Sequence, residues 1–144
     1  MKIKQFDERQ IQIRGKVFFH GFITAVALLL INAFFQSYDV IWASGFHQNV
    51  LILMAIVTVV SVESILRGAY FDSEPRRRMV IGIFGIISLI LLAFSVFHII
   101  QGEALIENGR LTDNGFSLAF AVMVTAITLV GIVNELIERR KSEE

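Results

Sequence analysis

Four long apolar stretches, separated by short polar segments, run through the sequence. They cover about residues 17–35, 48–66, 79–100 and 116–137. Each has roughly the 20 residues that a helix rising 1.5 Å per residue needs to cross a hydrocarbon core about 30 Å thick. The runs are continuous, whereas a strand of a transmembrane barrel alternates apolar and polar residues over about ten positions. The pattern therefore predicts an all-α integral membrane protein, a four-helix bundle in which residues 1–144 form a single domain.

The composition agrees with a membrane protein and argues against several other classes. Hydrophobic residues make up 55% of the chain, charged residues 18%, and the mean hydropathy is +0.67. A soluble domain must present a mostly polar surface, so a soluble enzyme, a secreted disulfide scaffold and a disordered tail are all disfavoured. The absence of cysteine removes thiol catalysis, thiolate metal sites and haem attached through cysteine.

The basic residues are distributed unevenly about the spans. Five lie in the arm of residues 1–16, four between residues 67 and 78, and three in the tail of residues 138–144. Twelve of the 13 lysines and arginines thus fall on one side of the predicted bundle, and Arg110 is the exception. Because cytoplasmic loops carry an excess of lysine and arginine, both termini are predicted to lie in the cytoplasm.

The N-terminal arm has the features of a helix start. Asp7 is in place as the N-cap, with Gln10 as its capping-box partner. We predict a short amphipathic helix that bends into, or continues as, the first span. This arm serves either as a membrane anchor or, through Asp7, Glu8 and Arg9, as a docking surface for a cytoplasmic partner.

The connection between the second and third spans holds Pro75, the only proline, directly before three arginines. Proline suits the first turn of a helix, where its missing N–H costs nothing. At the cytoplasmic boundary each arginine would gain about 1 kcal/mol near anionic headgroups. The determination of membrane topology is enough to explain these arginines, and binding of a phosphate ligand is the alternative. The predicted contacts to anionic lipid or to a partner are therefore Asp7, Glu8, Arg9, Arg14, Lys16, Arg76, Arg77 and Arg78.

Two glutamates lie inside the spans, near the predicted cytoplasmic ends. Glu63 precedes Arg67 by four residues, and Glu135 precedes Arg139 by four, a spacing at which helical side chains form ion pairs. The two segments are offset by 72 residues, half the chain, as two helical hairpins related by a weak repeat would produce.

These acids have two interpretations. In the first, they form interfacial ion pairs with Lys16, Arg78 and their own i+4 arginines, which tie the four helices together. In the second, they form a proton- or cation-coupled site, since charges inside a bilayer are costly and mark function. Asn134 would add an amide ligand there or hydrogen-bond across helices. The candidate intramembrane polar site comprises Glu63, Glu135, Asn134 and His20.

The histidines and the outer acids indicate no metal and no cofactor. The two axial imidazoles of a haem must lie at one depth, but His20 and His98 are near opposite ends of their spans. His47 and His98 are the only two that could share a site. The three acids of the loop after residue 100 do not have the spacing of a calcium loop.

Two further patterns concern loops and packing. Asn108-Gly109 is a turn signal, and Tyr38, Trp42 and Phe46 are aromatics of the kind that settle at the headgroup level. Small residues recur at helical spacing and predict close helix approach within the bundle or, alternatively, against another protomer. These stripes are Gly21 and Ala25, then Gly82, Gly85 and Ser88, and finally Ser117, Ala121 and Thr125.

The segment Asp7-Glu8-Arg9-Gln10, followed by Arg14-Gly15-Lys16 and then a span, resembles the start of several families of small bacterial membrane proteins with DERQ-type openings. The members of those families are uncharacterised, and their genes often neighbour small helix-turn-helix regulators. The resemblance implies a multi-pass protein of the bacterial plasma (inner) membrane. It supplies no catalytic or binding residues.

We expect a non-enzymatic protein, because no catalytic cluster of side chains is evident. Such a protein acts by binding a partner protein or lipid. Its expected partners are the bilayer and its anionic lipids, together with either further copies of the chain or a cytoplasmic protein, and no nucleic acid. The alternative is a small oligomeric transporter or channel with Glu63 and Glu135 in the ion pathway.

Overall fold

A computed structural model describes residues 8–68 and 74–143. The helices in this part of the chain are α1 (Glu8–Ser37), α2 (Gly45–Leu66), α3 (Glu74–Ile100) and α4 (Asp113–Glu143). Two short strands, β1 (Ile106–Glu107) and β2 (Arg110–Leu111), pair antiparallel between α3 and α4. All four helices are long and apolar enough to cross a membrane. The chain is therefore an all-α, four-helix, multi-pass membrane protein, as the hydropathy pattern predicts.

The helices extend beyond the predicted spans. α1 already begins at Glu8, so the predicted arm helix continues directly as the first span. Its 30 residues correspond to about 45 Å, more than the ~30 Å hydrocarbon core. α4 likewise continues through the predicted tail to Glu143. Pro75 lies in the first turn of α3, as predicted, while Asp7, the predicted N-cap, lies outside the described residues.

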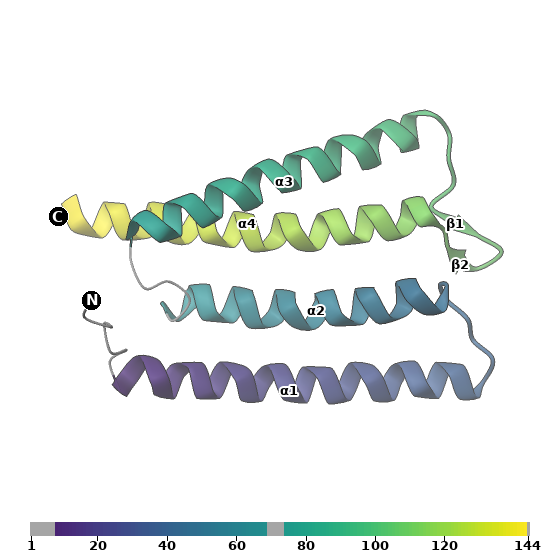
Figure 1. The fold of residues 1–144 in the computed structure, drawn as a ribbon, viewed down its shortest axis with the longest axis horizontal. Helices are drawn as coiled ribbons and strands as arrows, with labels where there is room; N and C mark the ends of the chain where they lie inside the picture. The colour runs from purple at the N-terminus through teal and green to yellow at the C-terminus, as the bar shows by residue number, and fades with distance from the viewer. Residues whose placement is uncertain (1–7, 69–73, 144) are drawn as a thin grey trace.

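The helices lie side by side in a row, in the order α1, α2, α4, α3 (Figure 1). α1 and α2 are antiparallel neighbours, as are α3 and α4, and the two central helices α2 and α4 run parallel. The protein thus consists of two helical hairpins joined along α2 and α4. This arrangement agrees with the two hairpins that the weak repeat suggests.

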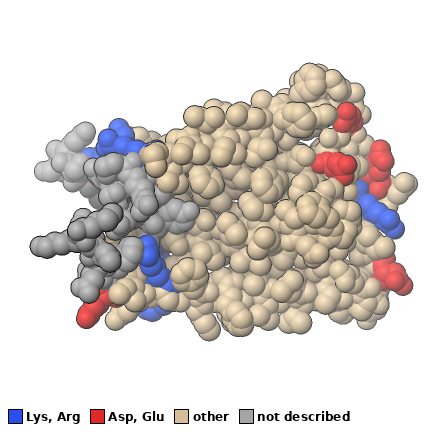
Figure 2. Space-filling view, viewed as in Figure 1, with Lys and Arg blue, Asp and Glu red and all other residues tan. Residues whose placement is uncertain are grey.

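The two ends of the row differ in charge and in loop structure. The start of α1, the end of α2, the start of α3 and the end of α4 lie at one end, which we call the terminal end (Figure 1). The α1–α2 loop and the β-hairpin lie at the other, the hairpin end. On the face shown in Figure 2, charged side chains gather at the two ends, with a broad band free of them between. An uncharged band of this kind suits the interior of a bilayer.

The β-hairpin turns at the dipeptide that the sequence indicates. Asn108 and Gly109 both have positive φ, 49° and 75°. Two successive residues with positive φ form the type I′ turn that matches the twist of a two-residue hairpin, and Asn-Gly is its preferred sequence. The two-residue strands on either side are too short to be indicated by the sequence pattern.

Small residues occur at close helix contacts. Gly21 of α1 faces Val60 of α2 and leaves no space for a Cβ atom. Gly131 of α4 packs on Ile81 of α3, whose Cγ1 lies only 3.1 Å from the position of a Cβ. Small side chains allow such approach between transmembrane helices. Gly82, in contrast, faces open space, so the small-residue stripe of the third span does not form a contact along its whole length.

Candidate functional site

The first polar cluster joins α1 to α2 near the terminal end. Nδ1 of His20 lies 2.8 Å from Oε1 of Glu63, and Nη2 of Arg67 lies 2.7 Å from the same oxygen. Arg67 follows Glu63 by one helical turn, so the predicted i,i+4 pair is present. The Glu63 side chain is only 18% exposed. A largely desolvated carboxylate is therefore held between a histidine of one helix and an arginine of its own.

The second polar cluster joins α3 to α4 at the same end. Oε1 of Glu135 lies 2.6 Å from Nη2 of Arg139 and 3.0 Å from Nε of Arg78. The Glu135 side chain is 11% exposed, while both arginine side chains are about half exposed. The buried carboxylate is therefore compensated by two guanidinium groups that still reach the surface.

The structure divides the predicted intramembrane site between the two hairpins. His20 joins Glu63, and Glu135 is held by arginines instead. Asn134 donates from Nδ2 to Glu138 Oε1 at 3.2 Å, so its amide interacts along α4. Lys16, expected to pair with these acids, makes no ion pair with another described residue. Sequence spacing alone could not place His20 on the α1 face that contacts α2.

A basic pocket lies between the start of α1 and the end of α2. Its volume is about 520 Å³, and its lining residues are Arg9, Gln12, Ile13, Lys16, Leu66 and Arg67. Arg67 also holds Glu63, whereas Arg9 and Lys16 make no ion pair with a described residue. The pocket thus presents two positive charges that no described carboxylate compensates. Gln12 and Arg67 are not among the predicted contacts, although Arg9, Gln12 and Lys16 recur at helical spacing.

The other residues predicted to contact lipid or a partner are dispersed. Glu8 begins α1 and is exposed. Arg14 is half-buried and has an interaction partner of its own. Asp7 lies outside the described residues, as do the side chains of Arg76 and Arg77 in the first turn of α3. Of the residues predicted for this surface, the structure therefore places Arg9 and Lys16 together in one pocket.

At the hairpin end, polar side chains connect the last turn of α3 to the first turn of α4. Nδ1 of His98 lies 2.9 Å from Oε2 of Glu103, and Nδ2 of Asn114 donates to the same oxygen. The hydrogen bond from His98 and then that from Asn114 lower the pKa of Glu103 below its ordinary value of 4.5, because both stabilise the charged carboxylate.

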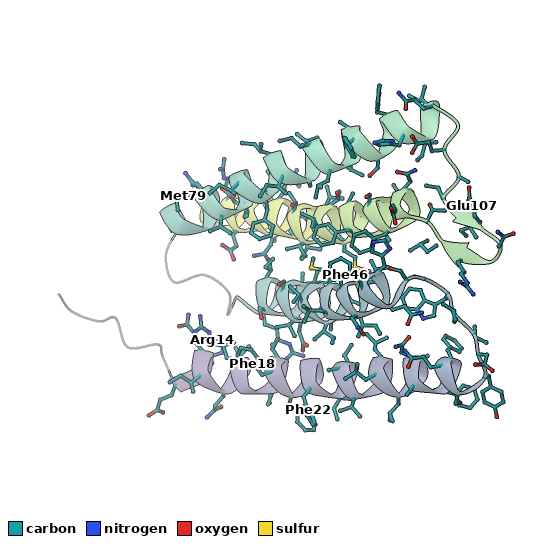
Figure 3. All side chains as sticks on the ribbon, turned by 45° about the vertical axis from the view of Figure 1, so that its right-hand side comes forward. Arg14, Phe18, Phe22, Phe46, Met79 and Glu107 are labelled. Atoms are coloured by element: carbon teal, nitrogen blue, oxygen red, sulfur yellow. The ribbon has the colours of Figure 1, made fainter. Side chains whose placement is uncertain are left out.

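Acidification should loosen this network. Because the pKa of Glu103 is lowered in the folded state, its stabilising contribution is present above pH 4.5 and is lost as the pH falls through the lowered value. We expect hydrogen exchange of the amides of residues 101–112, corrected for intrinsic rates, to accelerate over that window. Glu103→Gln should remove this dependence, whereas Glu107→Gln, in strand β1 of the hairpin that follows (Figure 3), should retain it. An unchanged pH profile in Glu103→Gln would contradict the assignment.

His47 and His98 do not form a common site. The His47 ring stacks on Phe116 with centroids 4.1 Å apart, and its Nδ1 lies 3.7 Å from Asp113 Oδ1. Each of these histidines therefore faces a different carboxylate. Among the side chains that the structure describes, those of residues 8–68 and 78–140, no three His, Asp or Glu group closely enough to hold a metal ion.

Trp42 turns inward, unlike the other two aromatics predicted for the headgroup layer. Its Nε1–H donates to Asn32 Oδ1 at 2.9 Å, and its carbonyl accepts from the Leu111 N–H at 2.7 Å. Tyr38 and Phe46 are 67% and 71% exposed, as residues facing headgroups would be. Trp42 differs because a buried side-chain acceptor is within reach, and its backbone ties β2 to the α1–α2 loop.

These features define a multi-pass helical membrane protein with a polar cluster in each hairpin and a basic pocket at its terminal end. Comparisons with protein-family models, with curated proteins and with solved structures gave no match. Any function must therefore be inferred from the chain's own geometry and charge.

Proposed function

We propose that the protein is a non-enzymatic, multi-pass protein of a bacterial plasma membrane that binds anionic lipid headgroups at its terminal end. The basic pocket, with Arg9, Lys16 and Arg67, is the observation that carries this proposal. The excess of lysine and arginine at the terminal end supports a cytoplasmic location for both termini. The bacterial membrane is supported by the resemblance of the segment 7–16 to the openings of small bacterial membrane proteins.

The pocket suits a phosphate group for three reasons. It lies near the start of α1, a helix longer than the hydrocarbon core, and therefore near the depth of the headgroups. The guanidinium groups of Arg9 and Arg67 offer planar, paired N–H donors, which match the oxygens of a phosphate. Each cation near an anionic membrane surface contributes about 1 kcal/mol.

Removing the two cations of the pocket that no described carboxylate compensates, Arg9 and Lys16, should weaken retention of anionic lipid. We expect Arg9→Gln combined with Lys16→Gln to reduce the affinity for phosphatidylglycerol about thirtyfold, from about 1 kcal/mol for each charge. Native mass spectrometry of protein released from nanodiscs of phosphatidylglycerol and phosphatidylcholine would measure the retained lipid.

The matched control is Arg140→Gln, which removes an exposed arginine near the end of α4 and outside the pocket. An equal loss in this control would show that total charge, and not the pocket, determines lipid retention. If wild-type protein retains no anionic lipid, but the start of α1 crosslinks to a cytoplasmic protein, the pocket serves a protein partner instead.

A transporter or channel is the second candidate function, and the contact between His20 and Glu63 favours it. Two titratable side chains from different membrane-spanning helices share a hydrogen bond there, as in a proton relay. Four helices in a row enclose no pore by themselves, so this function requires self-association. Flux lost in both Glu63→Gln and Glu135→Gln, with the oligomer intact, would favour it over lipid binding alone.

A further inference from the structure

An apolar groove runs along α1 and α2 in the half of the membrane toward the hairpin end. It has a volume of about 350 Å³ and is open rather than enclosed. Leu28 and Phe35 of α1, Ile52 and Ala55 of α2, and Met123 of α4 form its walls. These residues belong to helices long and apolar enough to span a membrane, and they give the groove an apolar lining that suits lipid chains rather than water.

One residue that lines the groove, Asn32, has a side-chain donor group that needs a hydrogen-bond acceptor. Asn32 lines the groove and is only 7% exposed. The indole N–H of Trp42 can only donate, so the amide oxygen of Asn32 must face it. The Asn32 Nδ2 group, which carries two N–H donors, is left without an acceptor among the described residues. An unpaired donor is costly where no water is present.

We infer that the groove binds one acyl chain of a glycerolipid from the leaflet at the hairpin end, and that the ester carbonyl of this chain accepts a hydrogen bond from Asn32 Nδ2. The ester carbonyl supplies the missing acceptor, and the methylene chain fills the apolar walls. Asn32 lies five residues before the end of α1 at Ser37, about 7.5 Å along the helix. That depth is close to the interfacial layer, for which the exposed aromatics Tyr38 and Phe46 are suited.

This lipid site is independent of the basic pocket. The groove lies at the opposite end of α1, and its recognition elements are one amide and an apolar channel, without a formal charge. It would therefore accept zwitterionic as well as anionic glycerolipids. Failure of either site leaves the other unaffected.

Trp42 provides a direct probe, since it is the only tryptophan of the chain and lines the groove. We would reconstitute the protein in phosphatidylcholine with brominated acyl chains, which quench tryptophan fluorescence on contact. We expect strong quenching in the wild type, and Ala55→Leu, which fills the groove, should lose most of it. The control Ala27→Leu adds the same volume on the exposed surface of α1 outside the groove and should quench as the wild type does. Equal quenching in Ala55→Leu would overturn the proposal.

The hydrogen bond can be tested in the wild type alone, which avoids any effect of a substitution on folding. Unbrominated ester-linked phosphatidylcholine should displace the brominated lipid about fivefold better than its ether-linked analogue, which has no carbonyl. Asn32→Leu should abolish that preference while the groove stays apolar. No preference for the ester in the wild type would exclude the proposed hydrogen bond.

Discussion

Replacing Glu135 by glutamine should destabilise the protein by about 2 kcal/mol. Glutamine keeps the volume but removes the charge that Arg78 and Arg139 share at 3.0 and 2.6 Å. Loss of one partner from a fully buried ion pair costs about 3–5 kcal/mol, and the exposure of both arginines reduces the expected loss to about 2 kcal/mol. Unfolding in detergent micelles would measure it. Glu107→Gln, an exposed acid at the hairpin end, should change the stability by less than about 0.5 kcal/mol.

A second substitution separates electrostatics from a general packing defect. Arg78→Gln in the Glu135→Gln background removes one of the two cations left facing each other, and should restore part of the lost stability. If Glu135→Gln is as stable as the Glu107→Gln control, the carboxylate does not hold α3 to α4. A loss of flux without a loss of stability would then favour the transporter over the structural role.

Gly115→Ala should also destabilise the protein by about 2 kcal/mol, against the intrinsic preference of a helix for alanine. Gly115 lies in the first turns of α4, where a Cβ atom would overlap the carbonyl oxygen of Leu105 and lie 2.7 Å from Leu111 Cδ1. A backbone oxygen cannot rotate away as a flexible side chain can, so the hairpin must shift. Overpacking of this kind typically costs about 1–3 kcal/mol.

The matched control is Gly82→Ala, since Gly82 lies in α3 and a Cβ atom added there would meet open space. There the alanine preference acts alone and should raise the stability by up to about 1 kcal/mol. Thermal unfolding would compare the two variants, and hydrogen exchange of residues 105–111 would report on the hairpin. A stabilised Gly115→Ala would mean that the hairpin does not rest on α4 as the structure places it.

The features that the sequence by itself determined depend on neighbours close along the chain. Hydropathy over about 20 residues is enough to locate a membrane-spanning helix, because a helix satisfies its own backbone in lipid. The i,i+4 pairs of Glu63 with Arg67 and Glu135 with Arg139 follow from helix geometry alone. The turn at Asn108-Gly109 follows from the positive φ that these two residues tolerate.

The tertiary structure decided which helices are neighbours and which side chains meet across them. Lipid chains are as apolar as leucine, so the hydrophobic effect does not favour one helix neighbour over another. Close packing at small residues such as Gly21 and Gly131 determines which helices are neighbours. The α1–α2 contact brings His20 to Glu63. The fold of the α1–α2 loop brings Trp42 back to Asn32, ten residues earlier. The packing of α1 on α2 places Arg67 beside Arg9 and Lys16 in one pocket.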